Sequence, residues 1–246
     1  MAGSISLKLG NWLYKNAFGV YNTIYPIFKN RQDKNEIAFI QQHLKPGSTV
    51  LDIGANIGFY SKILSRVAGP TGHVHCFEPD ITNFNHLKNN TQHLTNITVN
   101  NLAVSATNDP IKIYLSKELN VDHRTYPVDD YQSIIEIKAT AMDSYLTDGK
   151  TVDFIKMDIQ GFEIEALKGM KNTILNSPTI QILMEFWPYG LHAAGYSVQA
   201  LLDLLNEMEL SYTLTDDNST IDLNNVAQYE TWDKERFTNL YVVKKN

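Results

Sequence analysis

A regular alternation of short apolar runs with longer helical patterns is the feature that most constrains the fold, and it begins after Pro46 and Gly47. The predicted strands cover residues 49–53, 73–77, 97–102, 152–157 and 181–186. The predicted helices between them cover residues 57–67, 81–93 and 162–175. Strands that alternate with helices in this way form a parallel sheet with helices on both faces. The sequence therefore predicts an α/β fold.

Three segments depart from this alternation. Residues 6–44 have a helical pattern, so residues 1–44 are predicted to form a helical extension packed on the main domain, residues 45–246. An insertion at about residues 106–148 contains strand-like runs at 111–115 and 134–138. A late strand at 240–243 is expected to join the edge of the sheet in the antiparallel direction, as in many mixed sheets.

The composition suits one globular domain with a sizeable core, because 43% of the 246 residues are hydrophobic. The formal net charge is −6, from 21 basic and 27 acidic residues. Proteins that bind DNA or RNA usually present a basic face, so this balance argues against a nucleic-acid partner. The single cysteine, Cys76, excludes an internal disulfide and lies in an apolar run, where we expect it to be part of the core.

The N-terminal segment lacks the apolar core of a secretory signal, and no apolar run approaches the length of a membrane span. A single cysteine is also typical of proteins from a reducing compartment. We therefore expect a cytoplasmic protein without a membrane span.

The stretch VLDIGANIGFYSKIL, residues 50–64, places an acidic residue and two glycines at the end of the first predicted strand. In an open parallel sheet, ligands bind at the carboxyl ends of the strands, near the point where the strand order reverses. Asp52 and Gly54 are expected at that edge. Gly54 and Gly58 allow tight turns and a close approach of the backbone to a ligand. The helix that follows points its amides into the same space.

A dinucleotide site is disfavoured by the spacing of these glycines. The G-x-G-x-x-G fingerprint requires glycine at the positions of Gly54, Asn56 and Phe59. A second carboxylate, Glu78, nevertheless ends the next strand, about 20 residues beyond Gly58, where it suits two ribose hydroxyls. These features predict a ligand that contains ribose and lacks a pyrophosphate.

S-adenosylmethionine meets those terms. Asp52 can hold its ammonium group, directly or through a water, while residues 54–58 accommodate its chain and Glu78 binds its ribose. The adenine is expected near the end of the third strand, at residues 101–104. The residues predicted to bind this cofactor are Asp52, Gly54, Ala55, Asn56, Gly58, Phe59, Tyr60, Ser61, Glu78, Pro79, Asn101, Leu102, Ala103 and Asp158.

Three motifs carry a resemblance to a known family: DIGANIG at residues 52–58, FEP at 77–79 and IKMDIQG at 155–161. In this order they resemble the FkbM family of methyltransferases, over about residues 29–195. The segments DHR at 122–124 and EFWP at 185–188 resemble one branch of that family. The resemblance implies a class I methyltransferase fold, which is Rossmann-like with a mostly parallel seven-stranded sheet. It also implies methylation of hydroxyl groups on natural products or sugars.

Methyl transfer from a sulfonium is an in-line displacement at carbon, for which an enzyme mainly aligns the nucleophile and excludes water. An alcohol also needs a base, because its proton is tightly held until the oxygen begins to bond. Asp158 and Glu185 end the fourth and fifth predicted strands and are candidates for that base or for orienting the cofactor. Lys156 lies on the same strand face as Asp158 and can pair with either carboxylate.

Other assignments of this chemistry stay open. His123 is an alternative base, and Arg124 can fix an acceptor oxygen. Both belong to the insertion loop that resembles the family, and this loop is predicted to close over the acceptor. The two strand-end carboxylates can also ligate Mg²⁺, but nothing else nearby has the character of a committed metal ligand, so no metal site is assigned.

The leading hypothesis is an S-adenosylmethionine-dependent O-methyltransferase that acts on a small hydroxylated acceptor, such as a sugar or a polyketide. The nearest alternative is an N-methyltransferase for a small amine, and a cofactor-binding module without catalytic activity is another. Methylation of adenine in nucleic acids is disfavoured, because DIQG follows the fourth strand where such enzymes carry an Asn/Asp-Pro-Pro-Tyr run. The N-terminal helical region is the candidate contact surface for a homo-oligomer.

Overall fold

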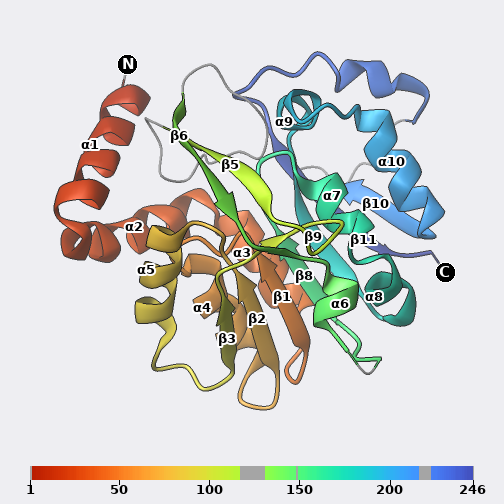
Figure 1. The fold of residues 1–246 in the computed structure, drawn as a ribbon, viewed down its shortest axis with the longest axis horizontal. Helices are drawn as coiled ribbons and strands as arrows, with labels where there is room; N and C mark the ends of the chain where they lie inside the picture. The colour runs from red at the N-terminus through yellow and green to blue at the C-terminus, as the bar shows by residue number, and fades with distance from the viewer. Residues whose placement is uncertain (1, 117–130, 148, 216–222, 246) are drawn as a thin grey trace.

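The computed structural model of the protein describes residues 2–116, 131–147, 149–215 and 223–245. Seven strands form its central sheet in the order β10-β11-β9-β8-β1-β2-β3 (Figure 1). Five of them pair in parallel: β1 (Thr49–Ile53), β2 (His73–Phe77), β3 (Ile97–Asn100), β8 (Phe154–Met157) and β9 (Gln181–Phe186). The predicted α/β fold with a mostly parallel, seven-stranded sheet is confirmed.

The C-terminal strand lies inside the sheet, so the prediction that it joins the edge is wrong. β11 (Thr238–Lys244) pairs antiparallel with β9 on one side and with β10 (Leu210–Leu214) on the other. The edge strand is therefore β10. Its sequence, LSYTL, alternates apolar and polar residues, which is a strand pattern, so the signal for this missed strand was present in the sequence.

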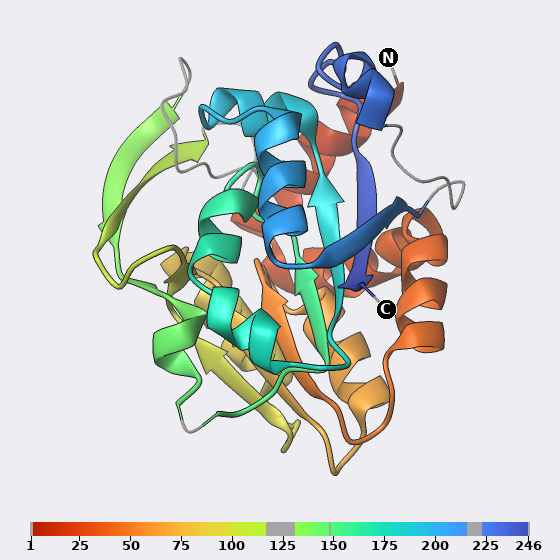
Figure 2. The ribbon, with the colours of Figure 1, turned by 90° about the vertical axis from the view of Figure 1, so that its right-hand side faces the viewer.

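Helices cover both faces of the sheet (Figure 2). Each face carries an apolar core of buried side chains. On one face pack α7 (Glu163–Lys168), α8 (Lys171–Asn176) and α10 (Val198–Glu207). On the other face pack α3 (Lys34–His43), α4 (Phe59–Ala68) and α5 (Ile81–Thr91). Side chains of a strand alternate between its faces. On β1, Val50 therefore joins the second core, with the buried Cys76, while Leu51 and Ile53 join the first.

All three helices predicted between the strands have different bounds in the structure, and α5 ends at Thr91, two residues before its predicted end. α4 begins at Phe59, two residues later than predicted, because Gly58 adopts a left-handed conformation with a φ of 88°. The predicted helix 162–175 is divided into α7 and α8 at Gly169 and Met170. Gly169 approaches the neighbouring backbone so closely that a Cβ would stand 1.9 Å from the carbonyl oxygen of Ser105.

The insertion contains β5 (Ile111–Ser116) and β6 (Tyr131–Ile137), which pair antiparallel and confirm the two predicted strand-like runs. They form a sheet of their own that arches away from the central sheet in Figure 2. β4 (Ala103–Val104) pairs with β7 (Ala139–Thr140), which brings the two ends of the insertion together before α6 (Met142–Tyr145) leads back to β8.

Two helices, α1 (Ala2–Asn16) and α2 (Phe18–Gln32), precede α3 and lie beside α5 in Figure 1. The Tyr14 hydroxyl donates a 2.6 Å hydrogen bond to Asn83 of α5, and the ring of Phe18 stacks on His86. Among the described residues, no helix has the length and apolar character needed to cross a membrane. After β9 the chain continues into α9 (Pro188–Ala193), and a 3₁₀ helix (Leu223–Gln228) precedes β11.

Candidate active site

Strand register aligns four of the predicted site residues in one row at the carboxyl edge of the sheet. Ile53 pairs with Phe77 on one side and with Met157 on the other, and Met157 pairs with Met184. The residues that follow these four are Gly54, Glu78, Asp158 and Glu185. The strand order reverses between β1 and β8, which is where ligands bind in open α/β sheets.

Gly54 is required by the protein's own backbone where β1 meets β8. Its φ is 83°, and a Cβ on it would stand 2.0 Å from the carbonyl oxygen of Asp158. A Cβ on Gly58 would stand 2.9 Å from a methyl group of Leu87. The two glycines therefore bring the loop after β1 close to β8 and α5. Their predicted close approach to a ligand stays a prediction, and contacts with the protein's own atoms add a second reason for glycine at these two points.

Asp52 is fully buried, and one of its oxygens has no partner within the described residues. The other oxygen, Oδ2, accepts a 2.5 Å hydrogen bond from the hydroxyl of Ser61. Burial raises the pKa of Asp52 to about 6, although the hydrogen bond from Ser61 and the charge of Lys156 lower it. Buried polar atoms are nearly always hydrogen-bonded. The unpaired Oδ1 fits the ammonium group of S-adenosylmethionine, held directly or through a water.

Glu78 is held at the end of β2 by two backbone amides. The amide of Asn56 donates to Oε2 at 2.8 Å, and the amide of Asp80 donates to Oε1 at 3.0 Å. Burial raises the pKa of Glu78 to about 8, although these two hydrogen bonds lower it. Each carboxylate oxygen can accept more than one hydrogen bond. The fixed side chain therefore retains acceptor capacity that suits ribose hydroxyls.

Asn101 fixes the turn that follows β2. Its side-chain amide donates to the carbonyl oxygens of Glu78 and Pro79, at 2.9 Å each. Leu102 packs against the first core, the one that contains Leu51 and Ile53, and Ala103 is buried in β4. These contacts bring the residues predicted to contact adenine next to Glu78, and the contact itself stays a prediction.

Lys156 lies buried at the centre of a charge network. Its ammonium nitrogen is 3.1 Å from Oδ2 of Asp158 and 3.9 Å from Oε1 of Glu36, and it lies 4.6 Å from the centre of the Tyr60 ring. Burial lowers the pKa of this ammonium, but the carboxylates of Asp158, Glu36 and Asp52 outweigh burial and raise the pKa. The predicted partner Asp158 is thus joined by Glu36 of α3, which lies in no recognisable motif.

Gln160 connects the two candidate catalytic carboxylates. Its side-chain amide donates to Asp158 at 3.0 Å and to Glu185 at 3.1 Å. Burial and the charges of Asp158 and Glu163 raise the pKa of Glu185 well above its usual range. Burial also acts to raise the pKa of Asp158, but Lys156 and Gln160 lower it overall. Environments that push the pKa values of two neighbouring groups apart are typical of acid–base sites.

Helix α2 contributes side chains to this edge, although its sequence pattern indicates only packing. The ring of Tyr25 contacts Phe59, a buried residue of the predicted cofactor set, edge to face. Burial is the main cause that raises the pKa of Tyr25, and the charge of Asp158 adds to it. Lys29 pairs with Asp33 and helps to lower the pKa of Asp158. The carboxyl edge is therefore bordered by α2.

His123 and Arg124 lie outside the described residues, so their roles, and the closure of their loop over the acceptor, stay predictions. Within the described residues, no group of three or more His, Cys, Asp or Glu side chains could hold a metal ion. Asp158 and Glu185 are instead joined by the amide of Gln160.

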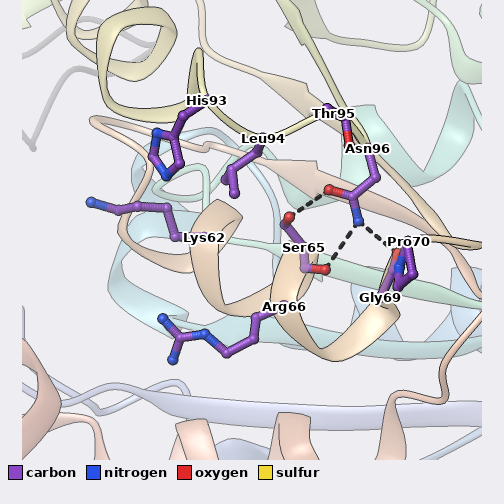
Figure 3. Close-up of a pocket in the computed structure, with 9 residues that line it drawn as sticks. All are labelled: Lys62, Ser65, Arg66, Gly69, Pro70, His93, Leu94, Thr95 and Asn96. Atoms are coloured by element: carbon purple, nitrogen blue, oxygen red, sulfur yellow. Dashed lines mark hydrogen bonds between the residues drawn. The ribbon is translucent and has the colours of Figure 1, made fainter.

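A pocket of about 380 Å³, drawn in Figure 3, is lined by none of the residues of this site. Its basic lining residues are Lys62, Arg66 and His93. Asn96 joins its two walls by donating to the carbonyl oxygens of Ser65, at 3.0 Å, and Gly69, at 2.8 Å. These walls precede the amino ends of β2 and β3, so the pocket is at the opposite edge of the sheet from the row of carboxylates. We assign it no part in methyl transfer.

The chain matches the family model described as "Methyltransferase FkbM domain" over residues 52–212. It is 26% identical to the 2-O-methyltransferase NoeI of Sinorhizobium fredii over 183 residues, which are 68% of this chain and 74% of that protein. It is also 26% identical to the hexuronic acid methyltransferase AglP of Haloferax volcanii over 194 residues, 78% of this chain and 75% of that protein.

Solved structures share the fold at low sequence identity. One, described as an rRNA methylase of Clostridium thermocellum, has a TM-score of 0.51 at 14% identity and covers 85% of this chain and 93% of that chain. Another, described as a methyltransferase of Streptococcus mutans in complex with SAH, has a TM-score of 0.50 at 10% identity and covers 85% of this chain and 96% of that chain. These likenesses show the class I methyltransferase fold.

Proposed function

Because the chain belongs to the FkbM family of S-adenosylmethionine-dependent methyltransferases, we propose that it methylates a hydroxyl group of a small, sugar-like acceptor. The observation that carries the proposal is the pair of carboxylates, Asp158 and Glu185, that Gln160 bridges. The pKa of Asp158 is lowered and that of Glu185 is raised. A hydroxyl acceptor needs a base of this kind, whereas a basic amine does not. The names of two relatives, a 2-O-methyltransferase and a hexuronic acid methyltransferase, support the choice of acceptor.

S-adenosylmethionine, when bound, supplies an activated methyl group. In our proposal Asp52 holds its ammonium group through the oxygen that lacks a protein partner. Glu78, fixed by the amides of Asn56 and Asp80, accepts hydrogen bonds from its ribose. The turn fixed by Asn101 borders the adenine.

Glu185 is the general base in this proposal, and Asp158 is a positioning residue. A carboxylate with a raised pKa holds a proton more firmly, so Glu185 is the better acceptor for the proton of a hydroxyl group. Asp158 is kept ionised by Lys156 and orients the cofactor from the end of β8. Gln160 fixes the two carboxylates relative to each other. His123 remains the alternative base.

The acceptor class is tested with purified full-length protein and S-adenosylmethionine carrying a labelled methyl group. The panel contains neutral hexosides, uronic acids, amino sugars and small amines. Transfer to a sugar hydroxyl, located by mass spectrometry of the product, is the expected result. Transfer to nitrogen alone would favour the N-methyltransferase, and cofactor binding without turnover on any acceptor would favour a non-catalytic module.

At a pH above its raised pKa of about 8, where Glu78 is ionised, Glu78→Gln is expected to weaken the binding of S-adenosylmethionine by about 2 kcal/mol, or roughly thirty-fold in Kd, as for hydrogen bonds to a charged group. Isothermal titration measures the effect for the cofactor and for its demethylated product, and NAD should not bind. Glu136→Gln, an exposed change on β6, is the control and should bind as the parent does. Unchanged affinity in a folded Glu78→Gln variant would show that the ribose is held elsewhere.

A further inference from the structure

Helices α1 and α2 both expose large apolar side chains. Eight large hydrophobic side chains among the described residues are at least half exposed, and six of these lie on the two helices. The six are Leu9, Trp12, Val20, Ile24, Ile27 and Phe28, with exposures of 50% to 58%. The remaining two, Ile81 and Phe237, lie singly in α5 and before β11. Scattered apolar side chains need no explanation, but a concentration of this kind marks an interaction surface.

The opposite side of these helices is already packed against the domain. On α2, Phe18 stacks on His86 with ring centroids 3.4 Å apart, and Tyr25 contacts Phe59. With 3.6 residues per turn, Val20, Ile24 and Ile27 lie on the side of α2 opposite to Phe18 and Tyr25. A helix that is apolar on both sides is normally covered on both. Within the described part of the chain, only the side of α2 that carries Phe18 and Tyr25 is covered.

The charge of this segment differs in sign from that of the rest of the chain. Residues 1–32 include four of the 21 basic residues and none of the 27 acidic ones. The remainder therefore carries 17 basic and 27 acidic residues, a net charge of −10. Lys15 and Arg31 are exposed in the last turns of α1 and α2. An apolar helix face combined with basic side chains is typical of helices that lie on anionic membranes.

We propose that α1 and α2 bind the surface of a membrane that contains anionic lipids. Ile24, Ile27 and their apolar neighbours enter the headgroup boundary and Trp12 lies at the interface. The exposed side chains of Lys15 and Arg31 face lipid phosphates. A second copy of the chain fits less well, because a symmetric dimer would place two positive segments face to face without acidic partners. Since the other side of α2 borders the carboxyl edge, this binding places the active site near the membrane surface.

Cosedimentation of the full-length protein with lipid vesicles tests the proposal. We expect binding to vesicles of phosphatidylcholine with phosphatidylserine, and little binding to phosphatidylcholine alone. Ile24→Ser with Ile27→Ser should weaken binding by at least about tenfold, from the apolar surface no longer buried. Lys15→Gln with Arg31→Gln should weaken it by about fivefold per charge, which corresponds to about 1 kcal/mol for each basic residue near an anionic surface.

The matched control is Leu175→Ser with Phe237→Ser, which removes two exposed apolar side chains from other parts of the surface. This variant should bind as the parent does, and circular dichroism should show that all variants are folded. Absence of vesicle binding by the parent, or equal binding by the double isoleucine variant, would overturn the proposal. A dimer in light scattering that only the isoleucine variant abolishes would assign the face to a second copy and also overturn it.

Discussion

Lys156→Met is expected to lower the free energy of unfolding by about 3 kcal/mol, at the low end of the range for breaking a buried ion pair. Methionine nearly preserves the apolar stem but removes the ammonium group that faces Asp158 and Glu36. These carboxylates then lose their compensation and repel each other. The low end applies because the side chain of Asp158 is 37% exposed, so that water screens part of its charge. Urea denaturation of the apo protein measures the change.

Lys168→Met is the matched control, since Lys168 also pairs with a carboxylate, that of Glu165, at 2.7 Å. The side chain of Lys168 is 44% exposed, so its loss should cost less than about 1 kcal/mol. If both variants lost the same free energy of unfolding, the buried ion pairs of Lys156 would contribute no more to stability than an exposed ion pair does. In the Lys156 variant the pKa of Asp158 should also rise, because the charge of Lys156 acts against burial to lower it.

The row of site residues at the carboxyl edge could be predicted because each stands at the carboxyl end of an apolar strand. Parallel strands end at one edge, so Glu78, Asp158 and Glu185 had to lie close to one another once their strands were identified. The strand register of the structure then shows which of these residues stand side by side on neighbouring strands. The order of the strands also follows from the fold that the family motifs imply.

The remaining features depend on contacts between distant parts of the chain. Glu36 and Lys29 belong to helices whose sequences show only a helical pattern, and their approach to Lys156 and Asp158 is set by how α2 and α3 pack. The bridge formed by Gln160 depends on its φ of 58°, which sequence does not specify for glutamine. The opposite pKa shifts of the two carboxylates follow from these contacts, so sequence alone left the choice of base open.

Glu185→Gln is expected to lower kcat by about 10² or more, the usual effect of removing a general base. Glutamine keeps the shape of the side chain, and its oxygen can still accept the hydrogen bond from Gln160. The affinity for S-adenosylmethionine should therefore change little. Initial rates with the acceptor identified from the panel, together with titration of the cofactor, separate the two quantities. Asp158→Asn is the comparison, in which we expect weaker cofactor binding.

The pH profile of kcat/KM identifies the base. The active form of Glu185 is the carboxylate, and burial raises the pKa of Glu185 well above its usual range. Activity should therefore increase with pH through that raised pKa and be lost below it. Because the pKa of Asp158 is lowered, a base at Asp158 would give a profile that is flat around neutral pH. A base at His123 would give a rise near the usual pKa of histidine, about 6.5.

The Glu185→Gln variant then distinguishes these cases. If Glu185 is the base, the residual activity of the variant should lose the rising limb that the parent shows. If the rising part of the pH profile persists in Glu185→Gln and disappears in His123→Ala, proton transfer is instead assigned to His123 in the insertion loop. Full activity of Glu185→Gln would reject the carboxylate as base. The fold and the cofactor site would be unaffected by that outcome, because they depend on the strand register and on Asp52 and Glu78.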